Sequence, residues 1–123
     1  MAVLPIIRMG NPVLRTPAAP VPPEVLASPA AQQLIDDMIE TMREAPGVGL
    51  AARQVNIPQQ LAVIEYAEGD DEEENEDAPP KPKKLFVIIN PEITRASEEK
   101  VMGVEGCLSI PGLIGEVERH EAI

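Results

Sequence analysis

The sequence predicts an α+β fold in which an N-terminal helix packs on an antiparallel β-sheet. One capped amphipathic segment, residues 29–45, has helical periodicity. Strand-like apolar segments follow at 61–66 and 85–89, without a regular alternation of helix and strand. Valine, leucine and isoleucine make up 32 of the 123 residues, which is enough apolar volume for one compact core, so we expect a single domain over 1–123.

The predicted helix has clear start and stop signals. Ser28 can cap the first backbone amides, and Pro29 is tolerated at the first helical position. Pro46 and Gly47 end the pattern. The apolar residues between these signals recur on one face and predict a stripe that packs in the core: Leu34, Ile35, Met38, Ile39 and Met42.

The other segments are less regular. The first thirty residues hold 7 of the 14 prolines, which predicts an extended segment that wraps over the domain, with a flexible arm as the alternative. Residues 67–84 combine an acidic run with a Pro- and Lys-rich stretch, so we expect a solvated loop between two strands. A docking tail for a basic partner and a cation-binding segment are its functional alternatives. Further strands are expected around 99–104 and from about 114 to 123.

Charge and composition exclude several classes of function. The net charge of −11 arises mainly from eight acidic residues within 68–77, and the other 10 basic and 13 acidic residues leave −3. A nucleic-acid-binding face would need clustered Lys and Arg, and the single Tyr and Phe offer little stacking. The longest wholly aliphatic or aromatic run is five residues, far shorter than the roughly 20 of a membrane-spanning helix.

The cysteine content and the N-terminus indicate the cytoplasm. The single cysteine, Cys107, has no partner for an intramolecular disulfide. The first five residues show no basic region before a long apolar stretch, so no signal peptide is expected. An organelle is the alternative location.

Residues 46–54, Pro-Gly-Val-Gly-Leu-Ala-Ala-Arg-Gln, form the first glycine-containing motif. A phosphate-binding loop does not fit, because no Lys-Ser or Lys-Thr follows and the segment comes after a helix. The motif is either a tight turn into a packed strand or the wall of a cleft. In a cleft, the Gln54 amide could donate to a developing oxyanion.

Residues 104–112, Val-Glu-Gly-Cys-Leu-Ser-Ile-Pro-Gly, form the second motif. A lone cysteine is either a small buried hydrophobe or a reactive thiolate. Lys100 is the only basic residue within ten positions of Cys107, so a metal ion is the better activator if the thiol reacts.

Together the two motifs resemble the first and second signature motifs of peptide deformylases. They occur in the family's order, about fifty residues apart, and the similarity extends to residues 10–15 and 89–91. The resemblance implies a hydrolase that cleaves the formamide C–N bond of N-formyl-methionine. Its partners would be nascent peptides near the ribosome, with no nucleic acid or membrane bound directly.

The resemblance also implies a metal centre. The ion is Fe(II), with Zn, Ni or Co as substitutes, held by the cysteine of the second motif and two histidines of a His-Glu-x-x-His helix. Metal-bound water is the nucleophile, and the Glu of that helix handles the protons. Cys107 matches the thiolate ligand. Gln54 and the backbone N–H of Leu108 match the groups that stabilise the tetrahedral oxyanion.

Three further residues receive substrate-binding or supporting roles from the resemblance. Gly49 matches a backbone contact to the substrate, and Val48 a wall of the pocket for the methionine side chain. Glu105 matches a residue that does not bind the metal itself but supports the cysteine ligand.

The third motif of the family is missing from this sequence. The only histidine, His120, lies 13 positions after Cys107, whereas the family's metal helix lies well downstream, so we interpret His120 as a strand residue. One thiolate is not a catalytic metal site, which takes three protein ligands. We therefore expect a domain that is incomplete at its C-terminus, a fragment or truncated product, inactive and incompletely folded by itself. A non-catalytic deformylase-like remnant or binding protein, and a cysteine hydrolase that pairs Cys107 with His120, are the alternatives.

Overall fold

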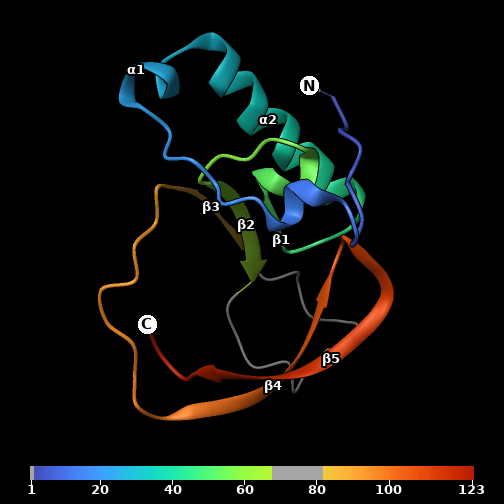
Figure 1. Ribbon diagram of the computed structural model, residues 1–123, viewed down its shortest axis with the longest axis vertical. Helices are drawn as coiled ribbons and strands as arrows, with labels where there is room; N and C mark the ends of the chain where they lie inside the picture. The colour runs from blue at the N-terminus through green and yellow to red at the C-terminus, as the bar shows by residue number, and fades with distance from the viewer. Residues whose placement is uncertain (1, 68–81) are drawn as a thin grey trace.

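A computed structural model describes residues 2–67 and 82–123. Two short helical turns precede the main helix, and the strands form two separate antiparallel sheets (Figure 1). The elements in chain order are η1 (Pro12–Arg15), α1 (Pro23–Leu26), α2 (Pro29–Glu44), β1 (Gly49–Ala51), η2 (Ala52–Val55), β2 (Leu61–Ala67), β3 (Lys83–Ile89), β4 (Lys100–Cys107) and β5 (Ile110–His120).

Helix α2 confirms the predicted helix to within one residue. The Ser28 hydroxyl accepts a hydrogen bond from the Ala31 N–H at 3.2 Å, and Pro29 occupies the first turn. Met38 and Met42 are both 0 % exposed, so the apolar stripe is core packing as expected. No helix in the described ranges is long and apolar enough to cross a bilayer.

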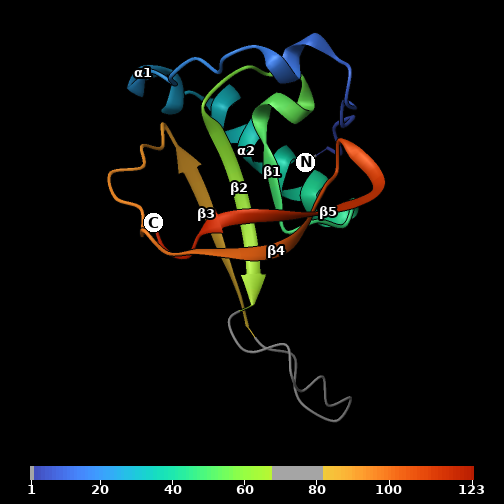
Figure 2. The same cartoon turned by 60° about the horizontal axis from the view of Figure 1, so that its bottom comes forward.

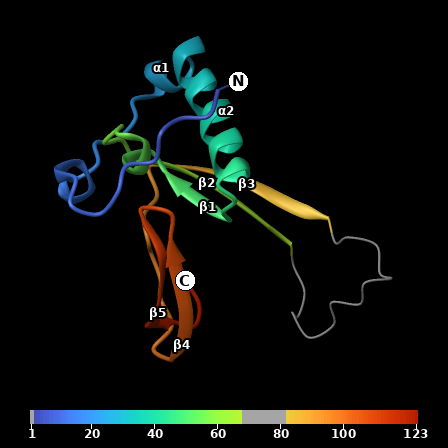
Figure 3. The same cartoon turned by 90° about the vertical axis from the view of Figure 1, so that its right-hand side faces the viewer.

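The first sheet has the strand order β1-β2-β3, with α2 packed against β1 and β2 (Figures 2 and 3). Leu50 pairs with Val63, and Val63 with Val87, so one apolar row crosses the sheet. The buried core combines this row with the helix stripe and its neighbours: Val21, Ile35, Met38, Ile39, Met42, Leu50, Ala52, Val55, Leu61 and Val63.

Strand β3 lies where it was predicted, but much of its apolar surface is exposed. Leu85, Phe86 and Val87 are 42 %, 44 % and 39 % exposed. The strand is at the edge of its sheet, and α2 covers β1 and β2 instead. An uninterrupted apolar run therefore does not identify a buried strand here.

Strands β4 and β5 form a hairpin that extends away from the layer of α2 (Figures 1 and 3). They confirm the expected strand near 99–104 and most of the strand expected at 114–123, and both extend further toward the turn. Strand β5 ends at His120, so the prediction was wrong for residues 121–123. No residue of β4 is buried, and within residues 2–67 and 82–123 the two strands pair only with each other. The register shifts between Gly106 and Cys107, which places a β-bulge beside the thiol.

The predicted loop at 67–84 falls mostly outside the described residues. Ala67 belongs to β2, and Lys83 and Lys84 belong to β3, so the prediction was wrong at these three positions. Pairing explains the difference, because Ala67 faces Lys83 and Tyr66 faces Lys84 across the ladder.

The N-terminal segment wraps over the domain, as predicted. The Asn90 side chain holds it with two hydrogen bonds to Val21. Its Oδ1 accepts from the Val21 N–H at 2.7 Å, and its Nδ2 donates to the Val21 carbonyl at 2.9 Å. The segment is not wholly extended. Pro12 and Pro23 each begin a four-residue helical turn. The first position of a helix makes no intrahelical hydrogen bond through its N–H, so proline is tolerated there.

One ion pair joins α2 to β2 and predicts a pH dependence of stability. The Arg43 Nη2 lies 2.6 Å from the Glu65 Oε2, and hydrogen bonding to Arg43 lowers the Glu65 pKa below its ordinary 4.5. The stability from a lowered pKa is present above the unfolded-state pKa and is lost as pH falls through the folded-state value. Glu65→Gln should therefore lower the free energy of unfolding at pH 7 and leave it unchanged at about pH 2. Urea titrations at the two pH values test this, and an equal difference at both would contradict it.

Candidate active site

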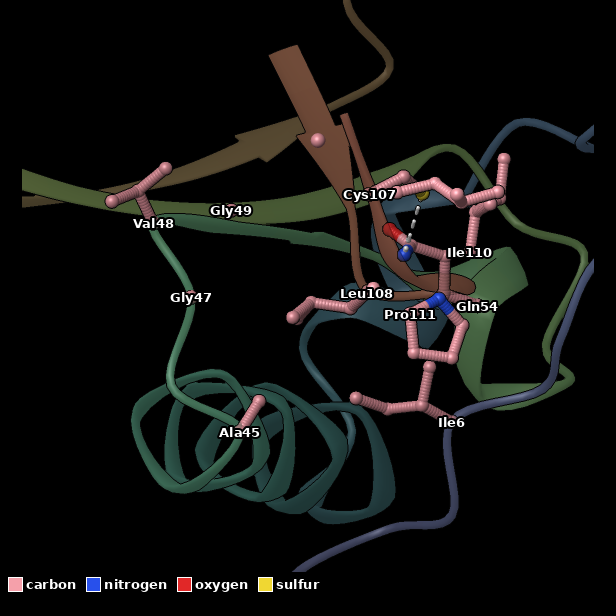
Figure 4. A pocket seen from close by; sticks show the side chains of 13 residues that line it. Ile6, Ala45, Gly47, Val48, Gly49, Gln54, Cys107, Leu108, Ile110 and Pro111 are labelled. Atoms are coloured by element: carbon pink, nitrogen blue, oxygen red, sulfur yellow. Dashed lines mark hydrogen bonds between the residues drawn. The ribbon is translucent and has the colours of Figure 1, made fainter. Parts of the chain in front are cut away.

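The two glycine-containing motifs meet at one cleft of about 780 Å³ (Figure 4). Its walls come from the turn after α2, from η2, from the turn between β4 and β5, and from the N-terminal segment. Four residues predicted for the site line it through their own motifs: Val48, Gly49, Gln54 and Cys107. Leu108 lines the same cleft, so five of the six predicted site residues come together.

The Gln54 side chain is held in a defined orientation. Its Oε1 accepts a hydrogen bond from the Ala51 N–H at 3.0 Å. Its Nε2 donates to the Ser109 Oγ at 3.2 Å and lies 3.7 Å from the Cys107 Sγ. Because the oxygen is already used, the amide presents its NH₂ group to the thiol and the cleft.

Cys107 is the last residue of β4 and is exposed. The bulge beside it changes the pairing, so that Cys107 faces Ile110 across the turn. A sulfur atom is a weak acceptor, so the contact from Gln54 leaves the thiol available to a stronger partner.

Leu108 offers a backbone donor beside this pair. Among the described residues, no acceptor receives its N–H. Its side chain packs toward Gly47, where a Cβ added to the glycine would lie 2.8 Å from the Leu108 Cδ1. The leucine side chain therefore anchors the turn, while its amide remains available to a ligand.

Val48 and Gly49 form the opposite wall. Val48 is 70 % exposed, and its side chain points away from Gln54 (Figure 4). Gly49 begins β1, the strand at the other edge of the sheet from β3. A peptide backbone could approach this edge closely, because glycine has no side chain to obstruct it.

Glu105 lies outside the cleft. Its carboxylate forms a two-pronged ion pair with Arg119, with the Arg119 Nη2 and Nε at 2.8 and 2.9 Å. Hydrogen bonding to Arg119 lowers the Glu105 pKa, so the group stays charged. Arg119 is its only side-chain partner in the described part of the chain, and the pair clamps β4 to β5.

His120 and Cys107 are far apart, which excludes the predicted alternative of a cysteine hydrolase using this pair. His120 pairs with Lys100 at one end of the hairpin, seven residues along β4 from Cys107, a separation of about 23 Å. The His120 Nδ1 is 2.6 Å from the Ser97 carbonyl oxygen. The interpretation of His120 as a strand residue is confirmed.

The described residues fit a catalytic metal only in part. Cys107 offers one sulfur ligand in the cleft. No group of three His, Cys, Asp or Glu side chains comes together within residues 2–67 and 82–123. A catalytic site of the zinc or iron type takes three protein ligands, so these residues alone do not complete one.

Three lining or supporting residues were missed from the sequence. Ser109 is 3 % exposed and accepts from Gln54, and its position inside the second motif was the available signal. Ile6 and Pro111 line the cleft. Ile6 gave no local signal, because it reaches the site only through the wrapping of the N-terminal segment.

Gly47→Ala tests the contact that anchors the turn. The new Cβ would meet the Leu108 side chain at 2.8 Å, so the leucine must rotate, at a cost of about 1–3 kcal/mol. We expect shifts of the Leu108 methyl and amide signals in NMR spectra. Gly103→Ala is the control, since nothing lies within 4 Å of its Cβ position. Unmoved Leu108 signals in Gly47→Ala would contradict the contact.

Comparisons with known proteins agree with this geometry. Residues 3–123 match the family described as polypeptide deformylase. The chain is 47 % identical to peptide deformylase 2 of Xanthomonas campestris, and the match covers all of this chain and 65 % of that protein. It is 39 % identical to the chloroplastic peptide deformylase 1A of Solanum lycopersicum, over 94 % of this chain and 43 % of that one.

Solved structures share the fold. The Met-Ala-Ser-bound class I type b peptide deformylase of Acinetobacter baumannii superposes with a TM-score of 0.81 at 40 % identity, covering 97 % of this chain and 72 % of that one. The Thermotoga maritima enzyme gives 0.77 at 36 % identity, over 98 % and 69 %. This chain thus spans 65 % of the length of the Xanthomonas protein and 43 % of the Solanum protein. With both motifs at one cleft and the match extending over nearly every residue, the chain belongs to the polypeptide deformylase family.

Proposed function

We propose that this chain supplies the substrate-binding side of a peptide deformylase site, where it binds the formylated amino terminus of a nascent peptide. The observation that carries the proposal is the Gln54 NH₂ group lying 3.7 Å from the Cys107 thiol in one cleft. Residues 1–123 would act as one domain, in the cytoplasm or an organelle.

In this proposal, two donors polarise the formyl carbonyl. The Gln54 amide is fixed by Ala51 and Ser109 before any ligand arrives, so its donor needs little reorganisation. The Leu108 N–H is the second donor. Donors aimed where negative charge develops stabilise an oxyanion more than a neutral carbonyl, which favours attack on the formyl carbon.

The remainder of the peptide would lie along the cleft. Its backbone would approach Gly49 at the edge of the sheet, and the methionine side chain would rest on the apolar lining near Val48 and Leu108. Apolar walls with a few placed polar groups are typical of such a pocket.

Hydrolysis requires more than this part of the site. Cys107 would be one ligand of Fe(II), with Zn, Ni or Co as substitutes, and Glu105 would support it through the β4 backbone. Since the described residues provide no further ligands together, we expect binding without turnover. This is also what a non-catalytic, deformylase-like binding protein would do.

Calorimetric titration tests the binding. Formyl-Met-Ala-Ser should bind at least about tenfold more tightly than Met-Ala-Ser, the effect of one hydrogen bond to the formyl group. Gln54→Ala should reduce the difference, leaving the share that the Leu108 N–H contributes. Gln33→Ala, on the exposed face of α2, should preserve it. Equal affinity of the unaltered chain for both peptides would contradict the proposal.

A turnover assay tests the metal chemistry. With added Fe(II) or Ni(II), we expect no release of formate from the peptide. Turnover that a chelator removes would show that ligands besides Cys107 are available to the chain.

A further inference from the structure

The N-terminal strap, defined here as residues Ala2–Met9, runs along α2 and then reaches both motifs of the site. At its start, the Ala2 N–H donates to the Asp37 Oδ1 at 2.8 Å, and the Leu4 N–H donates to the Thr41 Oγ1 at 2.8 Å. Thr41 is 1 % exposed, so the second bond is made at the edge of the core. These contacts fix the strap to a rigid helix.

The end of the strap bridges the two motifs. The Ile7 N–H donates to the Gln54 carbonyl at 2.8 Å, and the Met9 N–H donates to the Ser109 carbonyl at 2.8 Å. Two amides only two positions apart therefore hold segments that are 55 positions apart in the sequence. Between them and the helix, Ile6 lines the cleft (Figure 4).

Apart from the strap, the hairpin that carries Cys107 is attached at its turn, where Leu108 packs against the core and Ser109 is buried. No residue of β4 is buried, and β5 is the only strand paired with β4 in the part of the chain that the structure describes. Two side chains link the motifs directly: Leu108 packs toward Gly47, and the Gln54 Nε2 reaches the Ser109 Oγ at 3.2 Å and the Cys107 Sγ at 3.7 Å. Neither of these side-chain contacts joins the two backbones directly, whereas the Ile7 and Met9 amides hydrogen-bond to the backbone of both motifs.

We propose that the strap is the positioning element of this site, in which the Ile7 and Met9 amides hold Gln54 and Ser109 together and keep the Gln54 NH₂ group against Cys107. Its importance for substrate binding rests on the proposed function, but the positioning itself does not. Ile7 and Met9 are positioning residues, since they act through the backbones of η2 and the β4–β5 turn.

Replacing single strap amides with esters in the full chain tests the proposal. An ester at Ile7 or at Met9 removes one donor and leaves every side chain unchanged. The matched control is an ester at Arg8, whose N–H has no acceptor among the described residues. The readouts are the NMR signals of the Gln54 NH₂ group and the rate at which iodoacetamide alkylates Cys107.

We expect the Ile7 and Met9 esters to shift the Gln54 NH₂ signals and to speed alkylation of Cys107 several-fold, while the β2 amide signals stay in place. The Arg8 ester should change neither. General destabilisation would not move Gln54 signals in the folded population. Unshifted Gln54 signals in both test esters, or equal shifts with the Arg8 ester, would overturn the proposal.

If an ester variant fails to fold, a measurement on the unmodified chain still tests the proposal. The Ile7 and Met9 amides should exchange with deuterium more slowly than the Arg8 amide, and fast exchange at both would also overturn the positioning role. Binding of formyl-Met-Ala-Ser separates the two proposals. If the esters shift the Gln54 signals but the unmodified chain does not bind this peptide, the positioning role of the strap is supported and the proposed function is contradicted.

Discussion

The amides of the β4–β5 hairpin should exchange with deuterium at least about a hundredfold faster than those of β2, because the hairpin can open without unfolding the core. An isolated two-stranded hairpin is marginally stable in water. Strand β2 instead lies between two strands and carries Val63, which is 0 % exposed. Exchange resolved by residue, measured on the chain without ligand, tests this.

The exposed hairpin should also bind an apolar dye. Its outer surface includes several large side chains that are 48–79 % exposed: Val101, Met102, Val104, Leu113 and Ile114. We expect strong fluorescence of anilinonaphthalene sulfonate and a broad thermal transition. Hairpin amides as protected as those of β2, together with a sharp cooperative melt, would contradict both expectations.

Met38→Ala should lower the free energy of unfolding by about 2–5 kcal/mol, the usual cost of truncating a fully buried methionine. Met38 is 0 % exposed in the stripe that α2 packs against the sheet. Small domains are stable by only about 5–15 kcal/mol, so the loss is a large share of the total. Urea or thermal unfolding monitored by the helical signal of circular dichroism measures it.

The matched control for Met38→Ala is Asp36→Ala, two positions away on the exposed face of α2. A surface substitution of this kind should change stability by no more than about 0.5 kcal/mol. A small effect at both positions would mean that the interface between α2 and the sheet is not the core of this chain.

The elements of the fold could be predicted because their signals are local. Ser28 and Pro29 sit where a helix start requires them, and the period of the apolar residues fixes the buried face. The cores of β2 and β3, at 61–66 and 85–89, follow from short apolar runs between turn residues, whereas Lys83 and Lys84 carry no such signal. The convergence of Gln54 and Cys107 was expected from the resemblance, and the cleft contains both.

Features that depend on contacts distant in the sequence could not be predicted. Leu85 looks like a core residue by composition, but it is 42 % exposed, because α2 covers β1 and β2 rather than β3. Glu105 pairs with Arg119 across the hairpin rather than facing the cleft. The bond from Met9 to Ser109 spans a hundred residues and involves backbone groups, which no side-chain pattern encodes.

The proposed site requires that the Gln54 amide and the Cys107 thiol face one formyl group. This requirement is tested by the ¹³C NMR signal of formyl-Met-Ala-Ser labelled at the formyl carbon. On binding, this signal should move downfield as the Gln54 amide and the Leu108 N–H polarise the carbonyl, and the movement should be clearly smaller with Gln54→Leu. A bound signal at the same position in both proteins would show that the Gln54 amide does not reach the formyl group.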